Sequence, residues 1–248
     1  MYDEMLASLM WDEVCRLSEG VLPAELNLKE NHIQNLEESG ICPEAAAAAG
    51  IFSVNDELAE ALTGHRKAGM IFTYFTHDGK GLIKRPDGKP FFRLRPDERV
   101  PGFNYLSPKD GGVRLYYPRA PRLKLFNDDG VQNQRDLLTI TEGEKKALCL
   151  ALNGFPCIGL GGVSSYRTGP RGGNGQRSLG ALADDIDLRL FRSVVVMFDS
   201  DVTQKWQVQS AIRSIGFDIL STYEAKELNE SVRNGGNRDI EPERTLRL

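Results

Sequence analysis

The chain has 248 residues, of which 40% are hydrophobic and 27% charged, and its formal net charge at pH 7 is −4. These values are typical of globular proteins and exclude wholesale disorder, and the net charge by itself does not indicate a nucleic-acid binder. The four cysteines have no C-x-x-C spacing, so no recognisable zinc site is predicted. No apolar run reaches transmembrane length, and we expect a cytoplasmic protein that does not enter a membrane.

Charge is distributed unevenly along the chain. Through residue 62 there are 13 acidic and 2 basic residues, whereas residues 78–124 hold 12 basic and 5 acidic ones. In the acidic part, apolar side chains of residues 3–19 recur at helical spacing, and two further short helices are predicted between residues 26 and 51. We therefore predict an acidic helical N-terminal region, residues 1–67, that packs on the rest of the chain or on a partner.

The next segment, residues 68–130, is predicted to be basic and rich in β-structure. It alternates β-forming residues with D-G and P-D-G turn signals. Its arginines are interleaved with aromatic residues: Arg93, Arg95, Arg99, Arg114 and Arg119 with Phe91, Phe92, Phe103, Tyr105, Tyr116 and Tyr117. One interpretation is a cationic groove whose aromatic rings stack on a single nucleic-acid strand, with Arg93 and Arg95 as contacts. The alternative is that the aromatics form the hairpin core and the charges its solvated face.

Residues 131–225 alternate strand and helix patterns and predict an α/β domain. The predicted strands are 137–141, 156–162, 193–199 and 217–223, and the predicted helices 144–154, 179–191 and 205–216. Continuous apolar strands of this kind are typical of a parallel sheet that is buried on both faces, as in a Rossmann-like fold. Residues 226–248 are expected to form a polar, loosely held tail.

Three carboxylates follow strands of this predicted sheet. Glu142 comes directly after the first strand, and Asp199 and Asp201 follow the third. Because parallel strands end at one edge of a sheet, where ligands bind, these acids are expected to meet there. Carboxylates at this edge suit Mg²⁺ or Mn²⁺. The alternative is that each is an ordinary acid at a helix N-terminus.

The stretch "FDSDVT" also matches the nucleophile motif of a class of phosphatases. Those enzymes carry the motif on the first strand of their fold, whereas here it lies at the third predicted strand of the α/β domain.

The stretches "ITEGEKKAL" and "VVVMFDSDV" resemble the toprim domain that primases, topoisomerases and some nucleases share. With "IGLGGV" and "FFRLRPDE", the chain is most similar to an uncharacterised toprim-like family of phage and plasmid replication proteins, often fused to helicase or primase modules. The resemblance implies that Glu142 is a general acid or base, and that Asp199 and Asp201, with Glu142, bind Mg²⁺ or Mn²⁺. Many primases and topoisomerases have an acidic residue where this chain has Lys145 and Lys146.

The function that this resemblance implies is metal-dependent phosphoryl or nucleotidyl transfer on nucleic acid, primase-like or accessory to a primase. A toprim-type nuclease and a non-catalytic adaptor that links nucleic acid to a helicase are the alternatives. The expected ligands are DNA, single-stranded by preference, or nucleotides, with a helicase or primase as protein partner. Candidate phosphate contacts are Lys145 and Lys146 near the glutamate, and Arg167 and Arg171 in the glycine-rich loop after the second strand.

Overall fold

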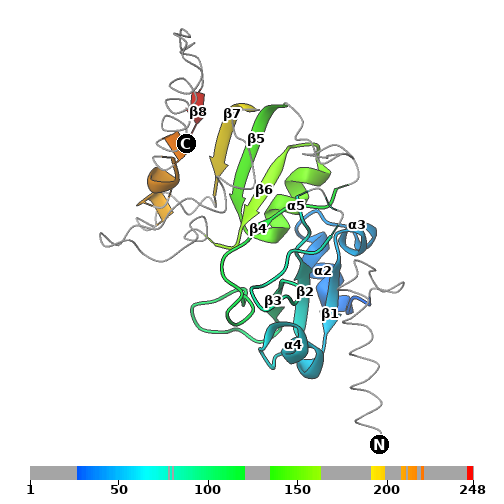
Figure 1. Cartoon of the computed structure of the whole chain (residues 1–248). Helices are drawn as coiled ribbons and strands as arrows, with labels where there is room; N and C mark the ends of the chain where they lie inside the picture. Colours follow the sequence, from blue (N-terminus) through cyan, green and yellow to red (C-terminus); the bar gives the residue numbers. More distant parts are fainter. Residues whose placement is uncertain are drawn as a thin grey trace, which may run out of the picture.

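Two β-sheets of different character organise the chain in the computed structural model (Figure 1). The structure describes residues 27–77, 79, 81–120, 135–162, 191–198, 208–210, 212–216, 219–220 and 245–247. One sheet has three antiparallel strands, and the other has five strands, most of them parallel. The predicted α/β class is therefore confirmed.

The first sheet has the strand order β1-β2-β3 and, with its helices, forms what we call the N-terminal module. Its elements are α2 (Glu30–Glu37), α3 (Pro43–Ala48), β1 (Ile51–Val54), α4 (Asp56–Thr63), β2 (Gly69–Thr73) and β3 (Phe92–Pro96). The predicted short helices between residues 26 and 51 correspond to α2 and α3. Strand β1 lies in the region predicted to be helical and pairs with β2 of the predicted β-rich segment, so one sheet spans both segments.

The second sheet has the order β4-β6-β5-β7-β8 and, with α5, forms what we call the α/β module. Its elements are β4 (Leu115–Tyr116), β5 (Arg135–Glu142), α5 (Glu144–Leu152), β6 (Cys157–Leu160), β7 (Phe191–Met197) and β8 (Thr245–Arg247). Strands β6, β5, β7 and β8 are parallel, whereas β4 pairs antiparallel with β6. The predicted alternation of strand 137–141, helix 144–154 and strand 156–162 is thus present as β5, α5 and β6.

Two predictions for the C-terminal part are wrong in detail. Ile219 and Leu220 are helical, although residues 217–223 were predicted to form a strand. The expected polar tail includes β8, which adds an edge strand beside β7. Apolar side chains at 215 and 219 pack into the core of the α/β module, and their spacing of four residues is that of one helix face.

A shared hydrophobic core joins the two modules. Phe72 and Tyr74 of the N-terminal module pack in one cluster with Ala147 and Leu148 of α5 and with Cys157 of β6. All five are at most 1% exposed, and full burial of a side chain such as Leu148 contributes about 1.5–3 kcal/mol. Helix α5 is therefore held from two sides, by its own sheet and by the N-terminal module.

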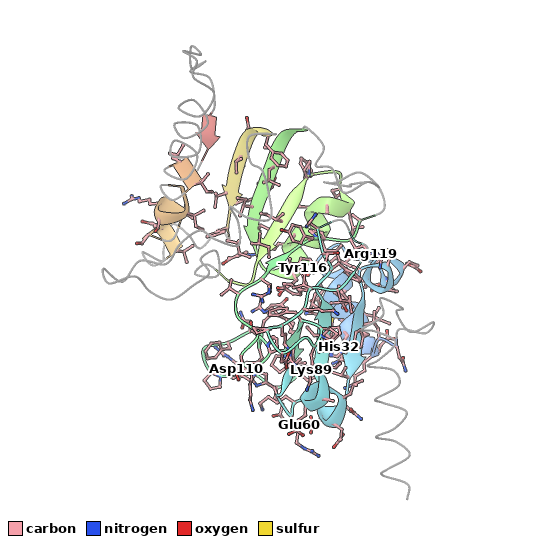
Figure 2. All side chains as sticks on the ribbon, in the orientation of Figure 1. His32, Glu60, Lys89, Asp110, Tyr116 and Arg119 are labelled. Carbon is pink, nitrogen blue, oxygen red and sulfur yellow. The ribbon has the colours of Figure 1, made fainter. Side chains whose placement is uncertain are left out.

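Helix α2 is held to the first sheet by a buried histidine, His32 (labelled in Figure 2). Its Nδ1 lies 2.7 Å from Ser53 Oγ on β1, and its Nε2 lies 2.6 Å from Asp97 Oδ1, just after β3. Lys29 completes the link by pairing with the other Asp97 oxygen at 3.3 Å. Burial raises the pKa of Asp97, but the hydrogen bonds from His32 and Lys29 outweigh it and leave the pKa below its usual value.

Strands β2 and β3 lie close together at Gly69, which pairs with Pro96. A Cβ atom at Gly69 would lie 2.3 Å from the backbone oxygen of Arg95 and 2.8 Å from Pro96 Cα. We expect Gly69→Ala to lower the free energy of unfolding by about 1–3 kcal/mol, because backbone atoms must move to admit the methyl group. Urea unfolding checks this, with Gly81→Ala as control, since its Cβ would meet no atom closer than 3.8 Å. Equal losses in the two variants would contradict the steric explanation.

Among the described residues, no helix is long and apolar enough to cross a membrane. The predicted helix at residues 3–19 and residues 179–190 of the predicted helix 179–191 lie outside the described residues. The last residue of the second prediction, Phe191, is not helical and begins β7.

Candidate functional site at the carboxyl edge of the parallel sheet

Glu142 is the last residue of β5, at the edge where the parallel strands end. Strands β5 and β7 pair in parallel, with Thr141 beside Met197, and Glu142 itself pairs with Leu160 at the end of β6. In Figure 1 the arrowheads of β5 and β7 point toward the N-terminal module. The Glu142 side chain is 20% exposed. Glu142 therefore lies at the carboxyl edge of the sheet, where the sequence predicted it.

Gly143 makes the turn from β5 into α5. Its φ is +79° and its ψ is 151°, a conformation that is strained for residues with a side chain. Its N–H donates to Leu160 O at 2.8 Å, and no atom lies within 4 Å of a Cβ built there. The glycine of the "EG" pair is therefore required by backbone conformation rather than by lack of space, and it turns the chain sharply after Glu142.

Lys146 lies one helical turn after Glu142 and contacts it. Its Nζ is 3.1 Å from Glu142 Oε1, and the two side chains are 40% and 20% exposed. A partly exposed pair of this kind contributes little to stability. It does fix the orientation of the carboxylate and put a positive charge at the edge of the sheet, where Lys146 was predicted to meet phosphate.

Lys145, the neighbouring predicted phosphate contact, points to a different place. Its Nζ donates to Asn35 Oδ1 at 2.9 Å and to Ser39 Oγ at 2.9 Å, both at the end of α2. Arg95 also donates to Asn35 Oδ1. Burial, and then the nearby Arg95 charge, lower the pKa of Lys145 to about 8. The structure thus brings Lys145 and Arg95 together, at the junction of the two modules.

Arg93 was predicted to contact nucleic acid, but its side chain is only 7% exposed and is engaged inside the protein. Its Nη1 lies 2.6 Å from Oε1 of Glu144, a fully buried carboxylate on the first turn of α5, and Tyr74 Oη donates to the same oxygen at 2.7 Å. Burial alone would lower the pKa of Arg93, but the Glu144 carboxylate raises it. Arg93 is therefore part of the contact between the modules. Sequence analysis missed Glu144, which no pattern distinguishes from a solvated helix acid.

For most of the aromatic residues of the basic segment, the alternative interpretation is correct, because they form the core. Phe91, Phe92, Tyr116 and Tyr117 are at most 5% exposed. Tyr116 lies where the two sheets meet (Figure 2), with its ring 5.2 Å from that of Tyr74. Of these predicted stacking residues, Phe103 is the one with a largely exposed ring, at 61%.

The other predicted site residues, Asp199, Asp201, Arg167 and Arg171, lie outside the described residues. Within the part of the chain that the structure describes, no three His, Cys, Asp or Glu side chains form a metal-binding group. Glu142 fits such a group in its chemistry, since it is a hard oxygen ligand that is partly open to solvent.

A family model described as a domain of unknown function (DUF3854) matches residues 129–228, fewer than half of the chain. A search of curated proteins finds no match. Solved structures similar to the chain include the Aquifex aeolicus primase (zinc-binding and RNA polymerase domains), with 13% identity and a TM-score of 0.47 over 83% of this chain and 49% of that one.

Two further similar structures are a DnaG catalytic core and a DnaG primase catalytic domain bound to single-stranded DNA. Their identities are 16% and 18%, and their TM-scores 0.41 and 0.43, each over 78% of this chain. The chain spans 60% and 63% of their lengths. Because all three TM-scores are below 0.5, we base the functional proposal on the residues of this chain.

Proposed function

We propose that the chain catalyses metal-dependent nucleotidyl transfer on nucleic acid, with Glu142, Asp199 and Asp201 at its centre. The observation that carries this proposal is the parallel pairing of β5 with β7. Thr141 pairs with Met197, so Glu142 at the end of β5 and Phe198 directly after β7 lie at the same edge of the sheet. Asp199 directly follows Phe198 in the chain. The toprim-like order of the motifs, "EG" after one strand and D-x-D after another, supports the same assignment.

The residues suit Mg²⁺ or Mn²⁺ bound by Asp199 and Asp201, with Glu142 close by. Such an ion, when bound, neutralises charge on phosphate oxygens in the transition state. Glu142 would accept the proton of the attacking hydroxyl, or return one to the leaving oxygen. Lys146, 3.1 Å from one Glu142 oxygen, would hold that carboxylate in place at the sheet edge. Lys146, Arg167 and Arg171 are the proposed contacts to the substrate phosphates.

We further propose a primase-like role in phage or plasmid replication, with single-stranded DNA and nucleotides as substrates. A helicase or primase would be the partner, and the acidic N-terminal residues, 13 acidic against 2 basic through residue 62, are candidates for its docking surface. This follows the resemblance of the motifs to the toprim-like replication family. A nuclease would use the same carboxylates to cut a strand, with water in place of the hydroxyl.

The direct test is to incubate wild type and an Asp199→Ala/Asp201→Ala variant with Mn²⁺ or Mg²⁺, labelled single-stranded DNA and nucleotides, and to resolve the products by length. Longer products from wild type alone would support nucleotidyl transfer, and shorter products would identify a nuclease. Unchanged DNA with both proteins, together with equal gel shifts, would overturn the catalytic proposal in favour of a binding adaptor.

A further inference from the structure

Four side chains from three elements meet where α2, β3 and α5 come together. They are Asn35 on α2, Ser39 just after α2, Arg95 on β3 and Lys145 on α5. The side-chain oxygen of Asn35 accepts from both cations, and Lys145 Nζ also lies 2.9 Å from Ser39 Oγ and 3.4 Å from Asn35 O. All four are partly exposed, so a small ligand can reach them from solvent.

Among the described residues, the two cations of this cluster have no anionic partner, unlike several other cations of the chain. Arg93, Lys146 and Arg66 each pair with a glutamate. Among the described residues, no carboxylate lies within ion-pair distance of Arg95 or Lys145. Glu38 acts on Lys145 only at longer range, and burial together with Arg95 still lowers the pKa of Lys145 to about 8. Two like charges are thus held against one neutral oxygen.

The end of α2 does not compensate for this charge. Lys145 meets the carbonyl oxygen of Asn35, as cations at helix C-termini often do. A helix end, however, carries at most about half a unit of negative charge. Arg95 and Lys145 together carry two positive units, so the cluster keeps an excess of about one and a half. A helix cap therefore explains one contact of Lys145. It does not explain why two positively charged side chains lie close together here.

Every member of the cluster can donate a hydrogen bond to an anion. Arg95 has a planar fork of N–H groups, Lys145 an ammonium, Ser39 a hydroxyl, and Asn35 an amide that presents its NH₂ group after rotation of the side chain. In the present arrangement, Asn35 Oδ1 occupies the point on which both cations converge, where an anion oxygen would lie. A guanidinium beside an ammonium matches the several oxygens and multiple charge of a phosphate group better than it matches a single carboxylate.

We propose that Arg95, Lys145, Asn35 and Ser39 form a binding site for a phosphate group, supplied by the backbone of a nucleic-acid strand or by a nucleotide. The site is built by both modules, so an occupied site would bridge them. It stands on its own contacts and requires no metal ion and no catalytic role for Glu142.

The test uses the full-length chain in EDTA, so that metal-dependent binding does not contribute. Calorimetry would measure the affinity for pyrophosphate and, separately, for a twelve-residue oligothymidylate without terminal phosphates. We expect Lys145→Met and Arg95→Gln each to weaken binding about tenfold or more, since each removes a charge-assisted hydrogen bond. Lys89→Met removes the same charge from an exposed hairpin of the N-terminal module (Figure 2) and should change pyrophosphate affinity less than twofold.

The two arms separate the sources of the phosphate. A loss with pyrophosphate alone identifies a nucleotide phosphate, a loss with the oligonucleotide alone identifies the strand backbone, and either supports the site. Affinities that stay at wild-type values in both arms would overturn it and leave the cations as caps of α2. If the variants fail to fold, NMR of isotopically labelled lysine in wild type decides. Pyrophosphate should raise the pKa of Lys145, and an unchanged pKa would contradict the proposal.

Discussion

Replacement of Arg93 by methionine is expected to lower the free energy of unfolding by about 3–5 kcal/mol, the usual cost of removing one partner of a buried ion pair. Glu144 is fully buried, and among the described residues only the hydroxyl of Tyr74, at 2.7 Å, would still donate a hydrogen bond to its carboxylate without Arg93. Its second oxygen has no hydrogen-bond partner within the described part of the chain, even with Arg93 present. Urea unfolding, followed by circular dichroism, measures the change.

Two controls show whether the loss comes from an uncompensated charge. Arg93→Met/Glu144→Leu removes both charges and keeps apolar volume, so it should be more stable than Arg93→Met alone. Arg66→Met breaks exposed pairs with Glu57 and Glu60, in which the arginine side chain is 59% exposed, and should cost at most about 1 kcal/mol. A loss in Arg93→Met no larger than that in Arg66→Met would show that the buried pair does not hold the modules together.

The second large effect is expected on catalysis. Glu142→Gln should lower the rate of product formation by about 10²- to 10⁴-fold, because the amide cannot take up a proton from the attacking hydroxyl. The fold should be nearly unchanged, since the pair with Lys146 that the substitution weakens is partly exposed. Single-turnover kinetics with Mn²⁺ and labelled single-stranded DNA measure the rate, and the unfolding midpoint reports on stability.

Glu98→Gln is the matched control, since it makes the same chemical change at a side chain that is 87% exposed, after the end of β3. It should keep the wild-type rate. If Glu142→Gln is as fast as Glu98→Gln, Glu142 is not the general acid or base, whatever the role of the two aspartates.

The α/β module could be predicted from the sequence because its signals are local. The apolar run before Glu142, the glycine after it and the helical spacing that follows are contiguous, and they correspond to β5, Gly143 and α5. Strand β1 was missed because it has only four residues and follows an alanine-rich helix. Strand β8 was missed because its three residues pair with a strand about fifty positions earlier.

The environment of Arg93 and Arg95 could not be predicted, because a strand pattern shows which residues share a face and not what covers that face. The two arginines alternate with Phe92 and Leu94, as expected for a strand with one solvated side. They stand opposite Phe72 and Met70 of β2, and this face packs on α5. The contact of Lys145 with Asn35 joins residues 110 positions apart, a distance over which no local pattern carries information.

The central claim is that the ends of β5 and β7 form a metal-dependent site, and Mn²⁺ binding tests it most directly. Electron paramagnetic resonance would measure free Mn²⁺ in titrations of wild type, Asp199→Asn/Asp201→Asn and the Glu98→Gln control. We expect wild type and Glu98→Gln to bind the ion with equal affinity, and the double variant to bind it more than tenfold more weakly, since it loses two charged oxygen ligands. Equal affinity in all three proteins, or no binding by wild type, would contradict the claim.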